Sequence, residues 1–143
     1  MTRALKRLRQ DRAGSTIIEF AFLAPVIITM FLAILQVGTW MHSYNALRSI
    51  AADAGRYTAV QYQKGNKINN ITISTWAHDR AISNYLFKDE NVSADVTDAA
   101  TQNIVGVTEK TLTMTVTYET FLQIIGGTNQ TFTFKRPIFV KSS

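Results

Sequence analysis

Three residues near the amino terminus combine chemistry with informative spacing: Gly14, Ser15 and Glu19. Glycine has no side chain, so a protease can approach the bond between Gly14 and Ser15 closely, and cleavage there leaves a new amine on Ser15. Glu19 is the fifth residue after Gly14 and lies at the start of a long apolar run. A carboxylate in a bilayer costs a few kcal/mol, which indicates that it has a role. The spacing therefore predicts processing at Gly14 and charge pairing through Glu19.

The apolar run must position these residues. The 21 residues from Ile17 to Val37 would form a helix of about 32 Å, which is enough to cross a membrane. Trp40 and Tyr44 follow, as aromatic residues often do at the far interface. Pro25 removes one backbone hydrogen bond inside the run, so we expect a kink there. The kink would either assist packing in a bundle or be a neutral irregularity.

The positive charge of the chain is concentrated before this run. Residues 1–14 hold five basic side chains and one acidic, a net charge of +4, whereas the whole chain carries +5. The remaining 129 residues are therefore nearly neutral, at +1. This distribution argues against nucleic acid as a partner. A basic flank beside a span predicts a cytoplasmic amino terminus and an extracytoplasmic carboxyl-terminal domain.

Three interpretations of this amino-terminal segment compete. A secretory signal has an apolar region of 7–15 residues followed by an Ala-x-Ala-like site, whereas this run is longer and no such site follows it. A plain single-span anchor leaves Gly14 and Glu19 unexplained, unless Glu19 merely reaches back to the headgroups. A type IV pilin-like signal accounts for both residues, because its peptidase cuts after the glycine and the apolar helix stays on the mature protein.

The stretch Asp11-Arg-Ala-Gly-Ser-Thr-Ile-Ile-Glu-Phe-Ala-Phe-Leu-Ala-Pro25 resembles the amino terminus of the TadE-like family. In that family a charged leader ends in Arg-x-Gly, and a small residue, a short apolar run, Glu with Phe or Tyr, and Ala-Pro follow. The alanine-rich sequence from Tyr44 to Tyr57, which ends in Gly-Arg-Tyr, is also similar. The resemblance covers about a third of the chain, from Asp11 to Tyr57.

The resemblance implies a minor pilin or pseudopilin of the tight-adherence (Flp, type IVb) pilus system. Such a protein is inserted in the bacterial inner membrane, with its carboxyl-terminal domain in the periplasm, and is cut after Gly14 by a prepilin peptidase. Glu19, followed by Phe20, would pair with the amine of a neighbouring subunit. The implied partners are other pilins or pseudopilins, the peptidase and inner-membrane lipid. Incorporation into the fibre, methylation of the amine and the choice between TadE and TadF-like proteins stay open.

The alternative function is an uncleaved, single-span anchored binding module outside the cytoplasm. No residue pattern favours an enzyme, a cofactor or a metal site. His42 and His78 are not at a metal-binding spacing, and Gly126-Gly127 does not form a phosphate-binding loop. We therefore expect no catalytic activity.

Beyond the apolar run, the chain keeps a helical pattern from Gln36 to about Val60. One apolar stripe contains Leu47, Ile50, Ala51, Ala54 and Tyr57, and it packs either on the protein's own sheet or on other subunits. Gly55 weakens this helix, and Lys64–Lys67 ends it. A second helix is expected over Ile71–Lys88, capped by Asn69, Asn70 or Ser74, with Trp76 in the core or against the first helix.

The carboxyl-terminal third alternates with a period of two, which predicts strands. They are expected around Val92–Thr97, over Thr111–Tyr118 and from about Gln130 to Val140, where Pro137 suggests a sheet edge or a strand end. The segment Phe121–Gly127 would cover the sheet or face a partner. The predicted fold is α+β, with a long amino-terminal helix, a second helix and a small antiparallel sheet. It divides into a leader (1–14), a transmembrane and amphipathic helix (15–60) and an extracytoplasmic domain (61–143).

Overall fold

The computed structural model describes residues 13–85, 87–101, 104–120 and 126–141. The chain forms a long helix, a second helix, a short 3-10 helix and three strands. These are α2 (Ala13–Gln63), α3 (Asn70–Tyr85), η1 (Asp89–Asn91), β1 (Val92–Asp98), β2 (Val107–Tyr118) and β3 (Gln130–Lys141). The predicted α+β fold is confirmed. The leader up to residue 12 and residues 121–125 of the predicted covering segment lie outside the described residues.

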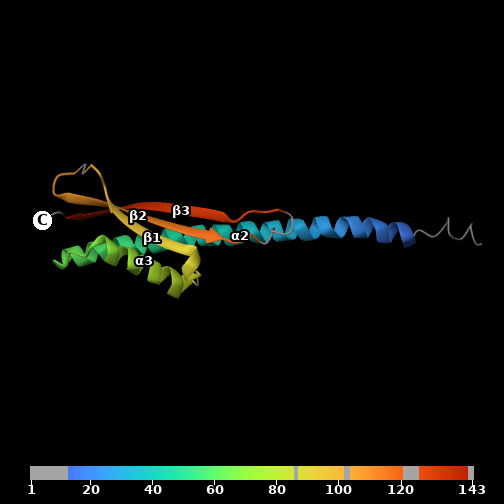
Figure 1. Cartoon of the computed structure of the whole chain (residues 1–143), viewed down its shortest axis with the longest axis horizontal. Helices are drawn as coiled ribbons and strands as arrows, with labels where there is room; N and C mark the ends of the chain where they lie inside the picture. Colours follow the sequence, from blue (N-terminus) through green and yellow to red (C-terminus); the bar gives the residue numbers. More distant parts are fainter. Residues whose placement is uncertain (1–12, 86, 102–103, 121–125, 142–143) are drawn as a thin grey trace, which may run out of the picture.

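Helix α2 dominates the shape of the molecule. Its 51 residues correspond to a length of about 77 Å. Figure 1 shows that the first half projects beyond the rest of the chain, whereas the second half lies beside α3 and the sheet. The residues from Ala13 to Leu35 and those from Gln36 onward therefore meet different surroundings.

The three strands form one antiparallel sheet in the order β1-β2-β3. Val92 lies opposite Val116, and Val116 lies opposite Phe132, so the three strands share one inward-facing row. β2 begins at Val107, four residues before the predicted start. β3 is an edge strand, the first of the two alternatives that Pro137 suggested, and it does not end at Pro137 but continues to Lys141.

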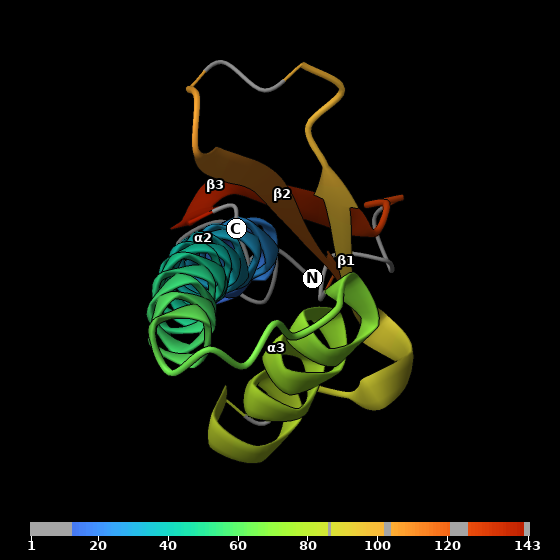
Figure 2. The same cartoon turned by 90° about the vertical axis from the view of Figure 1, so that its left-hand side faces the viewer.

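Both helices cover the same face of the sheet. In Figure 2, α2 lies under β3 and α3 lies under β1, while the described residues between β1 and β2 project to the other side. The buried core residues come from both helices and all three strands. They include Leu47, Ile50, Ala51, Ala54, Ile73, Ala77, Ala81, Val92, Leu112, Met114, Val116, Ile138 and Val140. The apolar stripe of α2 thus packs on the protein's own sheet.

The opposite sheet face carries the threonines, two pairs of which are hydrogen-bonded across strands: Thr115 with Thr133 (3.2 Å) and Thr117 with Thr131 (3.1 Å).

Helix α3 is capped by Asn69, whose Oδ1 accepts hydrogen bonds from the Thr72 amide (2.7 Å) and hydroxyl (2.8 Å). The helix ends at Tyr85, three residues before the expected end, and η1 follows shortly afterwards. The Trp76 ring stacks on Tyr57 of α2 with centroids 4.8 Å apart, so its predicted contact with the first helix is confirmed.

Gly55 does not interrupt α2. The helix runs eight residues further, to Gln63, and turns at Lys64 and Gly65, which has a positive φ of 77°. A Cβ atom at Gly55 would lie 3.7 Å from Arg136 Nε and 3.9 Å from Ile138 Cγ1 of β3. Tertiary packing against β3 therefore outweighs the low helix propensity of glycine.

Candidate functional site

The projecting half of α2 is apolar on every side. Apart from Leu32, which is half-buried, the large apolar side chains from Ile17 to Leu35 are exposed, and Phe22 reaches 77%. The exposed ones are Ile17, Ile18, Phe20, Phe22, Leu23, Val26, Ile27, Ile28, Met30, Phe31, Ile34 and Leu35. A helix that is apolar all round and uncovered suits lipid or a bundle of similar helices rather than water. By length and composition, α2 is the one helix in the described part of the chain that could cross a membrane.

The predicted processing site lies on α2 at the edge of the described residues, which begin at residue 13. A Cβ atom at Gly14 would meet nothing within 4 Å. The packing of the described residues thus gives no reason for a glycine at position 14.

Glu19 lies one turn above Ser15 on the same side of the helix. The Ser15 hydroxyl donates a hydrogen bond to Glu19 Oε1 over 3.1 Å, in an exposed position. An amine created at Ser15 would consequently lie near a carboxylate of its own chain. Phe20, next to Glu19, is 68% exposed. Both residues are accessible to a neighbouring helix.

Pro25 lies inside α2 without ending it. The Thr29 hydroxyl donates a hydrogen bond to the Pro25 carbonyl over 2.7 Å, which is the backward bond that threonine makes in apolar helices. Both residues are in the projecting half of the helix. The kink expected at Pro25 stays a prediction.

The domain meets α2 directly after the apolar run. Gln36 is buried, and its Oε1 lies 3.5 Å from the Thr120 hydroxyl. The Trp40 ring contacts Phe132 and the Tyr44 ring contacts Phe134, each pair with centroids 5.8 Å apart. The two aromatic residues expected at the membrane interface therefore also dock the start of β3. Sequence patterns cannot show such contacts, because the partners lie far apart along the chain.

An apolar hollow of about 300 Å³ opens at this junction. It is lined by Val37, Trp40, Met41, Tyr44, Asn45 and Phe132. The hollow continues the exposed apolar surface of the projecting half onto the base of the domain. Any bilayer that surrounds the residues up to Val37 would place it at the level of the headgroups.

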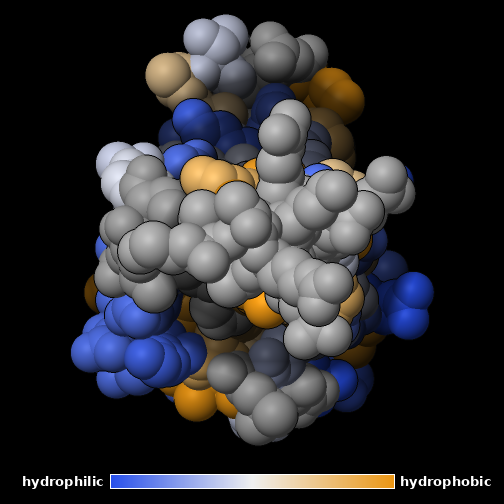
Figure 3. Space-filling model, turned by 90° about the vertical axis from the view of Figure 1, so that its right-hand side faces the viewer, coloured by the Kyte–Doolittle hydropathy of each residue, from blue (hydrophilic) through white to orange (hydrophobic). Residues whose placement is uncertain are grey.

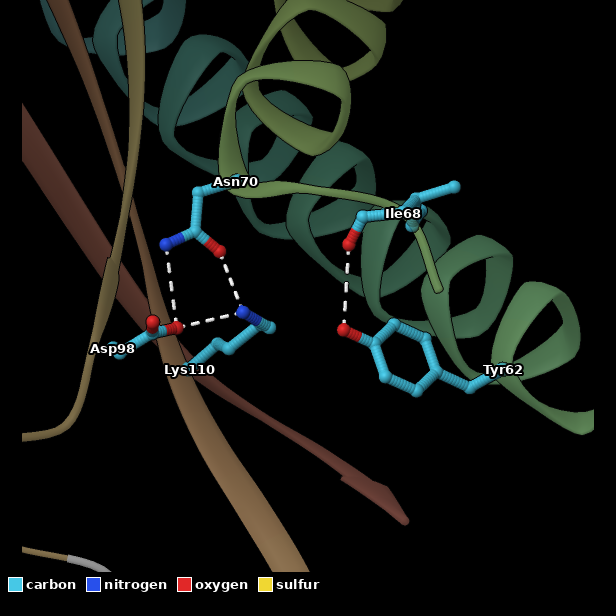
Figure 4. A network of polar contacts seen from close by, with 5 residues as sticks. All are labelled: Tyr62, Ile68, Asn70, Asp98 and Lys110. Atoms are coloured by element: carbon cyan, nitrogen blue, oxygen red, sulfur yellow. Dashed lines mark hydrogen bonds and ion pairs between the residues drawn. The ribbon is translucent and has the colours of Figure 1, made fainter. Parts of the chain in front are cut away.

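A polar network at the far end of the domain was not foreseen from the sequence. Lys110 lies on the inward face of β2, its side chain only 8% exposed. Its ammonium donates hydrogen bonds to Asp98 Oδ1 of β1 and Asn70 Oδ1 of α3, both over 2.6 Å. Asn70 also donates to Asp98 over 3.2 Å (Figure 4). Tyr62 donates to the Ile68 carbonyl over 3.3 Å, which closes the nearby loop between the helices.

The hydrogen bond from Lys110, and secondarily that from Asn70, lowers the pKa of Asp98 below its usual value of 3.8. The network satisfies the buried ammonium and ties the start of α3 to two strands, so its role is structural. The alternation along β2 contained a signal for it. Lys110 continues the inward row of Leu112, Met114 and Val116, where a charge needs a partner.

The described residues contain no group of three His, Cys, Asp or Glu side chains that could hold a metal ion. His78 Nε2 lies 3.3 Å from Asp89 Oδ1, which joins α3 to η1. His42 is exposed on α2. The candidate site therefore consists of Gly14, Ser15 and Glu19 at the foot of the apolar half-helix.

Comparison with known protein families supports the same segment. Residues 14–56 match the family model described as TadE-like protein. Over this range the chain is similar to TadE-like proteins. The matched residues run from the predicted processing site through the apolar half of α2 to the stripe that packs on the sheet. No curated protein and no solved structure matches the chain.

The TadE-like match is consistent with a protein associated with a Tad pilus, and α2 is long and apolar enough to span a membrane. The TadE-like family is a structural, pilus-associated family rather than an enzymatic one. The remainder of the domain, with α3 and the sheet, lies outside the matched residues.

Proposed function

We propose that this protein is a minor pilin or pseudopilin that assists the assembly of a Flp-type pilus. It is inserted in the inner membrane with its leader in the cytoplasm and its α+β domain in the periplasm. A prepilin peptidase cuts the chain between Gly14 and Ser15, and the apolar half of α2 then packs with the helices of other pilins.

The observation that carries this proposal is the arrangement at the foot of α2. The Ser15 hydroxyl and the Glu19 carboxylate face the same side, 3.1 Å apart, at the start of an apolar surface that the domain leaves uncovered. In hydrocarbon an unpaired carboxylate and an unpaired amine are both costly, and pairing lowers the cost of each. Cleavage after Gly14 creates that amine on Ser15. The Glu19 carboxylate of a neighbouring chain is its partner.

The open surroundings of Gly14 support recognition by an external enzyme. Since a Cβ atom at Gly14 would meet nothing among the described residues, a larger residue at position 14 should not disturb the described fold. Its effect would fall on whatever binds this segment. This separates a processing defect from a folding defect.

The test is the mature amino terminus. The chain is expressed with its candidate peptidase or with an inactive form of that enzyme, and intact mass and terminal residues are determined. We expect a peptidase-dependent start at Ser15 that Gly14→Leu abolishes. Gly38→Leu is the matched control, because Gly38 lies in the same helix and its surroundings are equally open. A chain that keeps its leader in every sample contradicts the proposal and favours an uncleaved anchored binding module.

A further inference from the structure

Two parts of the domain, on either side of β2, carry opposite net charge. One part contains α2 from Gln36, the loop up to residue 69, and β3, which packs on α2. It holds seven basic residues and one acidic residue. The other part runs from Asn70 to Asp98 and contains α3, η1 and β1, with five acidic residues, of which Asp98 is paired with Lys110 of β2, and two basic ones. Helix α3 packs under β1, so the charges divide the domain along the sheet rather than mixing within it (Figure 2).

We name the outer side of α2 and β3 the basic flank and the outer side of α3 and β1 the acidic flank. They lie at opposite edges of the domain, because β1 and β3 are the two edge strands. Seen end-on from the apolar helix, hydrophilic residues form the rim of the molecule on both sides (Figure 3). Arg48 and Lys135 are exposed on the basic flank, and Asp79 and Asp95 are exposed on the acidic flank.

The strand register places one charged residue of each flank at the same level along the sheet. Asp95 of β1 lies opposite Thr113 of β2, and Thr113 lies opposite Lys135 of β3. Asp95 and Lys135 therefore end the same row of the sheet, one at each edge. Both side chains belong to the threonine-bearing face, which neither helix covers. Two copies held at equal depth by the same apolar helix would bring Asp95 of one level with Lys135 of the other.

We propose that copies of this chain associate side by side in the membrane, with the acidic flank of one domain against the basic flank of the next. The proposal rests on the membrane anchoring of the proposed function, but it does not require cleavage at Gly14. Insertion fixes the direction of α2 in every copy, so copies differ only by rotation about the membrane normal and by lateral position. Complementary charge then selects which sides meet.

Symmetric pairs are disfavoured by the same observations. A two-fold pair that joins flank to flank would place like charges opposite one another. A pair that joins through the threonine face would bury a surface without a large apolar patch, whose hydroxyls already bond to each other at Thr115–Thr133 and Thr117–Thr131. A head-to-tail contact avoids both difficulties and leaves an unused flank at each end, so it extends to further copies.

Crosslinking between single-cysteine chains tests this arrangement, because the chain has no cysteine of its own. Ser93→Cys and Thr133→Cys, on two differently tagged full-length chains in membranes, report on the flanks, since both residues are exposed and end the same row. Asp95 and Lys135 stay intact in these chains. With a short bismaleimide, we expect dimers that join position 93 to position 133. Dimers that join 133 to 133, or 115 to 115 in Thr115→Cys chains, should be scarce.

Charge reversal provides the decisive comparison. Lys135→Glu, added to the Thr133→Cys chain, should lower the 93–133 yield about threefold, the size expected for an exposed ion pair. Asp95→Lys, added to the Ser93→Cys chain, should do the same, and the two changes together should restore the yield. Lys88→Glu on the Thr133→Cys chain is the matched control. It makes the same charge change on the flank that does not face the crosslink, so the yield should stay unchanged.

Three results would overturn the proposal. The dimers could be mainly 115–115 or 133–133, the 93–133 yield could stay the same in the charge-reversal variants, or the chain could crosslink exclusively to another protein. The amino terminus is read in the same samples. Flank crosslinks on chains that keep their leader would contradict the processing step while supporting the association, so the two failures are distinguishable.

Discussion

Glu19 is the residue on which the assembly hypothesis depends most directly. In the isolated chain its carboxylate has a hydroxyl partner, Ser15, at 3.1 Å, but a hydroxyl does not neutralise its charge. Within hydrocarbon the remaining cost is lowered by a cation. The amine of a neighbouring chain fits this requirement, and the amine on Ser15 of the same chain competes for it.

Replacing Glu19 should therefore affect pairing rather than processing. We expect Glu19→Gln to be cleaved as efficiently as the wild type. The amount that copurifies with other pilins should fall about tenfold, which corresponds to a loss of roughly 1.4 kcal/mol. Ser15→Ala is the control, because it removes the hydroxyl contact and keeps both charges. Equal copurification of the Glu19→Gln and wild-type chains would show that the carboxylate merely reaches the headgroups.

The Asp98–Lys110 pair makes a second prediction at this scale. Because the pKa of Asp98 is lowered in the folded protein, its contribution to stability is present above pH 3.8 and is lost as the pH falls below that value. At pH 7, Asp98→Asn should lower the free energy of unfolding by about 1–2 kcal/mol, a value reduced because the Asp98 side chain is 56% exposed. Denaturant titrations in detergent at pH 7 and pH 3 measure the difference, which should shrink in acid.

The complementary variant Lys110→Met should cost less than Asp98→Asn at pH 7. It removes the buried ammonium and leaves an aspartate that water can reach, whereas Asp98→Asn leaves a buried charge with weaker partners. A larger loss for Lys110→Met would mean that the packing of the lysine stem, rather than its charge, dominates this site.

Among the elements, α2 shows how local preference and packing compete. Its glycine at position 55 suggested a weak point, yet the helix continues past it against β3. A methyl group there would make ordinary contacts at 3.7 and 3.9 Å. We therefore expect Gly55→Ala to raise the free energy of unfolding by about 0.5–1 kcal/mol, because alanine loses less backbone entropy than glycine on folding.

Gly106 provides the opposite case. It has a positive φ of 81°, which alanine adopts poorly, and open space around it. Gly106→Ala should thus lower the free energy of unfolding by about 1 kcal/mol or more, through backbone strain alone. Chemical denaturation of both variants beside the wild type distinguishes the two effects. Destabilisation by Gly55→Ala would show that Arg136 and Ile138 cannot accommodate the methyl group.

The elements differ in how far their sequences foretold them. β2 was predictable because Leu112, Met114 and Val116 alternate with threonines, and such alternation is typical of a strand that is buried on one face. The end of α3 was not, since no capping residue announces it, and the contact between the Tyr85 and Phe87 rings, with centroids 6.4 Å apart, depends on the folded structure. The candidate site residues at the foot of α2, Gly14, Ser15 and Glu19, were predictable because their residue types and spacing indicate their roles. The junction of α2 with the domain was not, since it depends on contacts such as Gln36 with Thr120.

At the scale of the whole molecule, the boundary between anchor and domain falls within a single continuous helix. Before Gln36 nearly all the large apolar side chains of α2 are exposed, and from Gln36 onward the helix supplies buried residues to the core. The second half of α2 is thus as much a part of the domain as the sheet that it supports. The apolar half contributes no buried residue to the core.

This division predicts that residues 36–143 fold without the anchor. The fragment keeps the buried residues of α2 and the aromatic contacts with β3, so we expect one cooperative thermal transition and a circular dichroism spectrum with helix and strand. A fragment of residues 48–143 is the matched comparison. It loses the Trp40–Phe132 and Tyr44–Phe134 contacts and the buried Leu47, and its Tm should be lower by about 10 °C or more. Equal Tm values for the two fragments would place the boundary further along α2. Failure of the longer fragment to fold would show that the domain needs the apolar half-helix or the membrane around it.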